Sequence, residues 1–229
     1  RTAQRLMKCV SVSSTTKGPR SGLVNRAIAG RSTLSAERAY DSQGDGCLSI
    51  FSEVYETGAL VFPPGARVLE IGCAEGLFTE RMAPFCDRIT AVECALTARA
   101  RTEARLRRLP EGRVTVHLGN IRSWMPPAGT RFDLIVASDV LYYLETNGGH
   151  RLQHEPEFGP FLERMAGWLA SSGRMLVSHA FIGEEERRAR VAYRERLEQA
   201  GLRLEREVEV GRGLDKDGMV CLMSLLQRG

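Results

Sequence analysis

Short apolar runs alternate with helical patterns along the chain, which predicts an α/β fold. Residues 67–71 form an apolar run that is long enough for a buried strand and too short for a helix. Residues 77–85 then repeat apolar side chains at helical spacing, and a second apolar run, 89–92, ends in Glu93. The order of strand, glycine-containing turn, helix, strand and acid is typical of one half of a nucleotide-binding crevice.

The same alternation continues to the C-terminus. Two strands in succession at the end of the chain predict an antiparallel hairpin at a sheet edge, and the first of them should have one solvent-facing side because apolar and charged residues alternate in it. The predicted elements are a helix at 95–109, strands at 114–118 and around 134–136, a helix at 161–169 that stops near Gly173, a strand at 175–180, a helix at 184–200, and strands at 202–210 and 219–226.

The chain before the first strand predicts two further regions. Residues 1–22 are rich in Arg, Ser and Thr without a period, which indicates a basic and flexible leader; a transit peptide or a contact with an acidic partner are the alternatives. Residues 23–62 are helical in pieces around a polar loop. Pro and Gly at 63–65 mark the entry to the main domain, 63–229.

Composition limits the classes of protein. The chain has 229 residues, 43% of them hydrophobic and 26% charged, as expected for a single globular domain with extensions. No apolar run approaches the ~20 residues of a membrane helix, so no membrane partner is expected. The cysteines are scattered without metal-ligand spacing, which favours a reduced, cytoplasmic protein. The net charge is +4, but residues 1–36 hold seven basic residues and no acid, so the remainder carries 4 − 7 = −3, which argues against a nucleic-acid partner.

The turn after the first strand contains candidate chemistry. Glu70, Gly72, Ala74 and Gly76 stand at alternate positions, and small residues there allow a ligand to approach the backbone closely. A dinucleotide site requires a third small residue where Leu77 stands, which disfavours a nicotinamide-dependent oxidoreductase. The pattern resembles the first motif of S-adenosylmethionine-dependent methyltransferases; a purely structural small-residue turn is the alternative.

Two blocks extend this resemblance, RVLEIGCAEGLFTERMAPFCDRITAVE and FDLIVASDVLYYL. Over roughly residues 65–145 the chain resembles the nodulation protein S family of methyltransferases, which methylate an amine on a sugar-derived precursor. The resemblance implies a Rossmann-like, seven-stranded, mostly parallel sheet with helices on both faces and an antiparallel last strand. It also implies S-adenosylmethionine as the cofactor and residues 23–62 as a helical lid.

The resemblance further implies a set of cofactor-binding residues. The turn and the start of its helix form the floor of the site, Glu93 binds the ribose hydroxyls, and Asn120 takes the place of the usual adenine-binding acid, a turn asparagine being the alternative. The residues expected to contact the cofactor are Tyr40, Glu70, Gly72, Cys73, Ala74, Gly76, Phe78, Glu93, Cys94, Asn120, Ile121, Ser138 and Asp139.

The acceptor is expected to be a small molecule methylated on an amine or a hydroxyl. Tyr142, Tyr143, His150 and His154 are the candidate catalytic residues on the acceptor side, because an imidazole titrates near neutrality; surface histidines of a loop are the alternative. The two histidines lack a third ligand, so no metal is expected.

Other readings of the chain stay open. A cofactor-binding regulator without catalysis is the alternative function. Residues 138–141 lack the tetrad of a DNA-adenine methyltransferase. Oligomeric state is open between a monomer and a homodimer.

Overall fold

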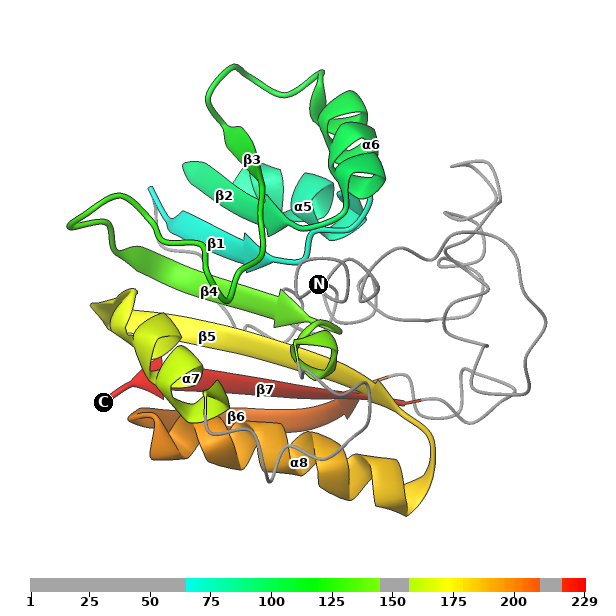
Figure 1. Ribbon diagram of the computed structural model, residues 1–229, viewed down its shortest axis with the longest axis vertical. Helices are drawn as coiled ribbons and strands as arrows, with labels where there is room; N and C mark the ends of the chain where they lie inside the picture. Colours follow the sequence, from blue (N-terminus) through cyan, green and yellow to red (C-terminus); the bar gives the residue numbers. More distant parts are fainter. Residues whose placement is uncertain (1–64, 145–156, 211–219) are drawn as a thin grey trace, which may run out of the picture.

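The protein folds around one seven-stranded sheet (Figure 1), described here from a computed structural model for residues 65–144, 157–210 and 220–229. The strand order is β3-β2-β1-β4-β5-β7-β6. Strand β7 is antiparallel to both of its neighbours, and all other neighbouring strands are parallel to each other. This confirms the predicted Rossmann-like sheet with an antiparallel last strand. The strands are β1 (Arg67–Ile71), β2 (Arg88–Glu93), β3 (Val114–Leu118), β4 (Phe132–Ser138), β5 (Leu169–Phe181), β6 (Leu202–Val210) and β7 (Val220–Arg228).

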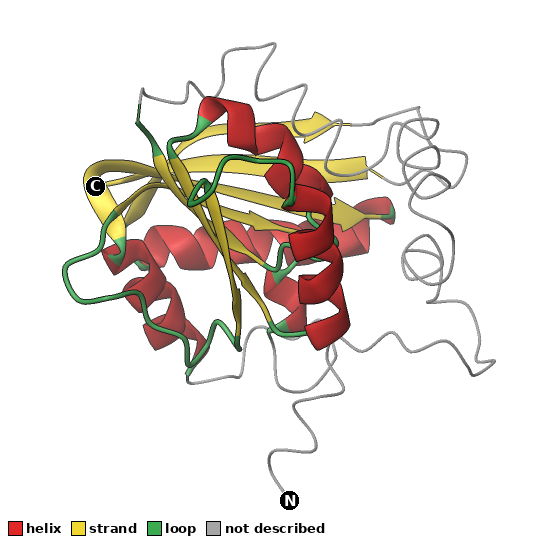
Figure 2. Cartoon of the chain, turned by 90° about the horizontal axis from the view of Figure 1, so that it is seen from above, coloured by secondary structure: helices red, strands yellow, loops and turns green. Residues whose placement is uncertain are grey.

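Helices cover both faces of the sheet, as the view from above shows (Figure 2). The central strands are buried on both faces, so alternate residues belong to two cores. Ile135 packs in the core that contains α7 and α8, whereas Leu134 and Val136 pack in the core that contains α5. The helices are α5 (Leu77–Met82), η1 (Ala83–Phe85), α6 (Leu96–Leu106), η2 (Leu141–Tyr143), α7 (Phe158–Gly167) and α8 (Gly183–Gln199).

The strand order reverses between β1 and β4, and this positions the site. β1 pairs with β2 on one side and with β4 on the other, with Ile71 level with Val92 and with Ala137. Gly72, Glu93 and Ser138 therefore follow at the same carboxyl edge of the sheet. In open α/β sheets ligands bind at such a switch point.

The boundary between α7 and β5 differs from the prediction. The helix begins at Phe158 and ends at Gly167, and β5 begins at Leu169 and not at residue 175. The extra residues form an irregularity opposite the start of β4. A Cβ on Gly173 would lie 2.9 Å from the carbonyl oxygen of Phe132 and 2.9 Å from the amide nitrogen of Ala170. Gly173 is therefore a tight packing point within the strand and not a helix stop.

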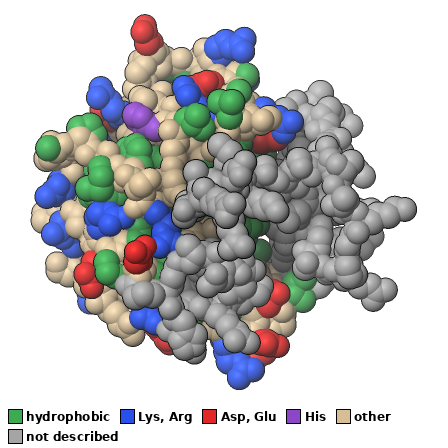
Figure 3. Space-filling view, in the orientation of Figure 1, with side chains coloured by type: hydrophobic (Ala, Val, Ile, Leu, Met, Phe, Trp, Pro, Cys, Tyr) green, Lys and Arg blue, Asp and Glu red, His purple; other side chains and the backbone are tan. Residues whose placement is uncertain are grey.

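The surface of the described part of the chain carries mixed charges. On the face shown in Figure 3, Lys and Arg side chains are interspersed with acidic and apolar ones. Within the described residues, no helix has both the length and the apolar character needed to cross a bilayer. The predicted leader (1–22) and lid (23–62) lie outside the described residues, so this division of the chain stays a prediction.

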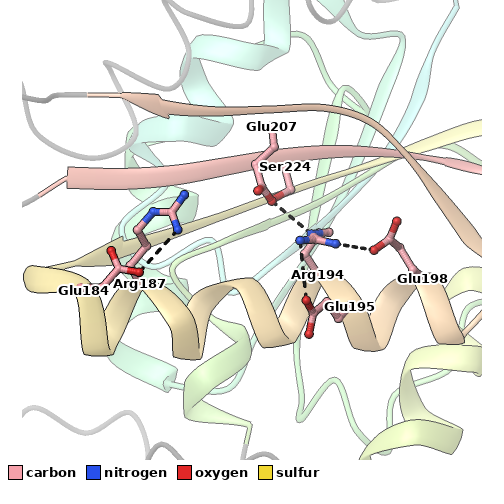
Figure 4. Close-up of polar contacts among 7 residues, drawn as sticks. All are labelled: Glu184, Arg187, Arg194, Glu195, Glu198, Glu207 and Ser224. Carbon is pink, nitrogen blue, oxygen red and sulfur yellow. Dashed lines mark hydrogen bonds and ion pairs between the residues drawn. The ribbon is translucent and has the colours of Figure 1, made fainter.

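The predicted solvent-facing side of β6 is wrong, because a bulge at Glu205 changes the faces of the strand. Leu204 is opposite Leu226, but Arg206 is already opposite Leu225. The shift brings Glu207 and Glu209 onto the face that α8 covers. There Glu207 accepts a hydrogen bond from Ser224 (2.8 Å) and pairs with Arg194, as Figure 4 shows. Arg187 and Arg194 of α8 thus pair with these carboxylates in place of solvent.

Candidate functional site

The turn after β1 reverses the chain within five residues. Gly72, Ala74 and Gly76 have φ angles of 71°, 48° and 78°, in the left-handed region. The Gly76 amide donates to the Cys73 carbonyl (2.8 Å), which closes the turn, and Gly76 is the N-cap of α5. A positive φ costs a residue with a Cβ about 1–2 kcal/mol, so Ala74 is held in a strained conformation by its surroundings.

The two glycines have a physical reason that the sequence did not show. A Cβ on Gly72 would lie 2.7 Å from Val140 Cγ2, and one on Gly76 would lie 2.7 Å from Thr102 Cγ2. The expectation that these glycines are small to admit the cofactor stays a prediction, and the structure adds a second reason for both glycines. They are required by their φ angles and by close packing against the β4 loop and α6.

Glu93 ties this turn to the end of β2. Its carboxylate is buried (2% exposed), accepting the amide N–H of Ala74 (3.0 Å) on one oxygen and that of Ala95 (2.8 Å) on the other. An ionised carboxylate offers about four acceptor sites, so the predicted bonds from ribose hydroxyls are compatible with this arrangement. Ribose binding stays a prediction, and fixing the turn is an additional role.

Glu70 lies beneath the turn. It is buried and accepts a short hydrogen bond from the Thr79 hydroxyl (2.6 Å) of α5. Burial raises the pKa of Glu70 to about 7, the Thr79 bond lowers it in part, and the charge of Glu93 raises it further. In this structure Glu70 bonds to the helix that follows the turn, and its expected contact with the cofactor stays a prediction.

The adenine side rests on the loop after β3. The side-chain oxygen of Asn120 accepts the amide N–H of Arg122 (3.0 Å), and its carbonyl accepts those of Ser123 and Trp124. Asn120 is thus a turn asparagine, and its side-chain oxygen still has a second acceptor site for an adenine amino group. Ile121 is buried in the core, as is Phe78. Adenine recognition by this loop and a cofactor contact for Phe78 remain predictions.

The cysteines flanking the site differ in exposure. Cys94 is exposed beside Glu93, whereas Cys73 is buried with its sulfur 3.8 Å from the Thr102 hydroxyl. Burial and the neighbouring Glu70 raise the pKa of the Cys73 thiol, so it packs as a neutral group.

Ser138 and Asp139 join the ends of β4 and β5. The hydroxyls of Ser138 and Ser178 lie 2.9 Å apart, and an Asp139 carboxylate oxygen accepts the amide N–H of Ala180 (2.7 Å). Asp139 has a φ of 51°, a conformation that aspartate tolerates better than most residues. The structure thus places a carboxylate at the switch point, one strand away from the turn.

The acceptor side is only partly described. Tyr143 is partly buried in η2, and the side chain of Tyr142 lies outside the described set, as do Tyr40, His150 and His154. In the described ranges, no group of three or more His, Cys, Asp or Glu residues could hold a metal ion.

Sequence reasoning missed the contribution of α6. The periodicity predicted a helix at 95–109 but none of its ion pairs. Arg101 pairs with Glu75, and both Arg105 and Arg108 pair with Glu80. Glu75 lies in the turn and Glu80 in α5, more than twenty positions earlier than their partners, so no local spacing could have revealed the pairs.

The residues at this edge fit S-adenosylmethionine. Acceptor sites remain on the buried carboxylate of Glu93, and the turn and Asp139 flank the switch point on adjacent strands. A carboxylate with remaining acceptor sites has the polarity that ribose hydroxyls require.

Comparison with known proteins identifies the family. A family model described as nodulation protein S (NodS) matches residues 63–154. The nodulation protein S of Sinorhizobium fredii is 32% identical over 171 residues, which cover 72% of this chain and 71% of that protein. The corresponding protein of Bradyrhizobium diazoefficiens is 42% identical over 81 residues, 34% of this chain and 36% of its own length.

Solved structures agree in fold. The N-methyltransferase NodS of Bradyrhizobium japonicum in complex with S-adenosyl-L-homocysteine has a TM-score of 0.61 at 22% identity, covering 90% of this chain and 96% of that one. A second structure of that enzyme has a TM-score of 0.60 at 25% identity, covering 78% and 97%. The chain therefore belongs to the nodulation protein S family and is an S-adenosylmethionine-dependent N-methyltransferase.

Proposed function

We propose that the enzyme methylates an amine of a sugar-derived small molecule that lies across the carboxyl ends of β4 and β5. The observation that carries this proposal is the meeting of three groups at one switch point: the turn at 72–76, the Glu93 carboxylate and the Asp139 carboxylate. The first two suit the cofactor, and the third suits an amine. Family membership supports the amine over a hydroxyl, and a catalytic role over that of a cofactor-binding regulator.

The cofactor, when bound, supplies a methyl group on a positively charged sulfur. The protein then has to hold, orient and shield the reactants. Glu93 binds the ribose hydroxyls, and the turn at 72–76 supports the methionine part. Asn120 accepts from the adenine amino group.

The amine must lose a proton before it attacks, and Asp139 orients it. A carboxylate accepts hydrogen bonds from an amine and would hold it at the carboxyl end of β4. Tyr143 lies one turn further along the chain, in η2, and is the acceptor-side residue nearest in sequence to Asp139 among those the structure describes. His150 and His154 are the candidates for the group that takes the proton.

A small acceptor also agrees with the surface. Nucleic-acid enzymes present clustered positive side chains to the phosphate backbone. On the described part of the face in Figure 3 the charges are mixed, which favours a small acceptor over a nucleic acid.

The proposal is tested by methyl transfer from radiolabelled S-adenosylmethionine to three matched oligosaccharides, carrying a free amine, an N-acetyl group or only hydroxyls. We expect transfer to the amine alone, with kcat/KM rising with pH as the amine deprotonates. Asp139→Asn should reduce kcat/KM for the amine while S-adenosylhomocysteine still binds. Transfer to the hydroxyl-only compound at an equal rate would contradict the proposal.

A further inference from the structure

Helix α6 contacts the backbone of the turn at 72–76 through two side chains. Thr102 donates its hydroxyl to the carbonyl oxygen of Ala74 (2.6 Å), and Arg105 donates its Nε to that of Glu75 (2.9 Å). Residues 102 and 105 are three positions apart, on one face of the helix. Thr102 is fully buried, and the Arg105 side chain is 10% exposed. Two consecutive carbonyls of the turn are thus held from the same side.

The opposite side of Ala74 is held by β2. Its amide N–H donates to Glu93, so both polar groups of Ala74 have partners that fix its orientation. Ala74 needs this support because its φ of 48° is unfavourable for a residue with a Cβ. Without one of these bonds, the turn would populate conformations with a negative φ at Ala74.

Ion pairs and packing hold α6 against the turn and α5. Arg105 also pairs with Glu80 of α5 (3.3 Å). The Cγ2 methyl of Thr102 occupies the space beside Gly76 that a Cβ would fill. A shift of α6 would therefore move the turn and the start of α5 together.

We propose that Thr102 and Arg105 are positioning residues of the methyltransferase site, which hold Ala74 and Glu75 in the conformation that receives the cofactor. This inference rests on the proposed role of the turn as the cofactor floor. It assigns to α6 a share of the affinity for the cofactor, exerted through two backbone carbonyls.

The expected effect follows from population. If only the observed turn conformation binds, the apparent Kd equals the intrinsic Kd divided by the fraction of protein in that conformation. Loss of one net hydrogen bond corresponds to about a 2- to 12-fold change in that balance. Thr102→Val should therefore raise the Kd for S-adenosylhomocysteine by up to about 12-fold and raise the KM for S-adenosylmethionine similarly, with kcat nearly unchanged.

Calorimetric titration with S-adenosylhomocysteine tests the inference in four variants. Thr102→Val keeps the shape and the methyl beside Gly76 but loses the hydroxyl. Thr102→Ser keeps the hydroxyl, so the first should weaken binding more than the second. Ala74→Gly combined with Thr102→Val should restore binding, because glycine adopts a positive φ without cost. Arg99→Gln is the matched control on the same helix, since Arg99 pairs with Glu103 and not with the turn.

Rescue by glycine separates positioning from general packing. If Thr102→Val binds as the wild type does, or if Ala74→Gly does not restore its affinity, the inference is overturned. Should Thr102→Val unfold, Arg105→Gln is titrated in its place, and unchanged affinity there overturns the inference equally. Failure of the proposed cofactor site would look different. Glu93→Ala would then bind S-adenosylhomocysteine with the same affinity as the wild type.

Discussion

Glu70→Gln should make the enzyme more stable than the wild type at alkaline pH. Burial raises the pKa of Glu70 in the folded protein to about 7, from an ordinary value of 4.5. Below pH 4.5 the carboxyl is protonated in both the folded and the unfolded state, so it does not make the free energy of unfolding depend on pH. As pH rises toward 7, the unfolded chain loses its proton before the folded protein does, so stability falls with rising pH. This is the reverse of the behaviour of a salt-bridged carboxylate.

The magnitude follows from the two pKa values. A difference of about 2.5 pH units corresponds to about 3 kcal/mol of lost stability once both states are ionised. Glutamine has nearly the same shape, carries no charge, and its side-chain oxygen can still accept the Thr79 hydroxyl. The free energy of unfolding of Glu70→Gln relative to the wild type should therefore increase by about 2.5 kcal/mol between about pH 5 and pH 8.

Urea unfolding followed by circular dichroism at these two pH values measures this difference. Comparison with the wild type is necessary because other groups titrate over the same range. Glu103→Gln, in an exposed helix pair with Arg99, is the control and should stay within about 0.5 kcal/mol of the wild type at both pH values. Parallel curves for Glu70→Gln and the wild type would refute the reasoning, as would a variant that loses stability as pH rises.

Three further predictions test other parts of the fold. Burial lowers the pKa of His179 to about 3, so its contribution to stability is lost as pH falls below about 6.5. In urea unfolding, the wild type should therefore lose about 2 kcal/mol more stability than His179→Leu between about pH 7.5 and pH 5. Gly76→Ala should lower the free energy of unfolding by about 2–4 kcal/mol. Gly112→Ala is the control, because Gly112 has a φ of 75° and no atom within 4 Å of its Cβ position, and it should lower that free energy by about 1–2 kcal/mol. Equal losses would exclude the clash with α6. Arg194→Met should cost about 1–3 kcal/mol in urea unfolding because Glu207 loses a charged partner in a largely buried setting, and a neutral result would contradict the role of this pair (Figure 4).

Local periodicity predicted most of the fold. The apolar runs at 67–71 and 89–92 became adjacent parallel strands, and 202–210 is a strand over that whole range. The turn was identified because glycine and alanine stand at alternate positions between a strand and a helix. These features depend on residues close together in the chain.

Non-local contacts account for what the sequence did not reveal. The bulge at Glu205 reverses which residues of β6 face α8, and a strict period of two cannot register one added residue. Thr102 of α6 packs against Gly76 and also donates a hydrogen bond to the carbonyl oxygen of Ala74. Pairing of this kind is set by tertiary structure, which no single stretch of sequence encodes.

A crystal structure with S-adenosylhomocysteine tests the central claim most directly. The account predicts the sulfur and the amino-acid tail above the turn at 72–76, with both ribose hydroxyls within about 3 Å of the Glu93 carboxylate. A ligand bound away from this edge of the sheet, or a ribose that makes no contact with Glu93, would contradict it.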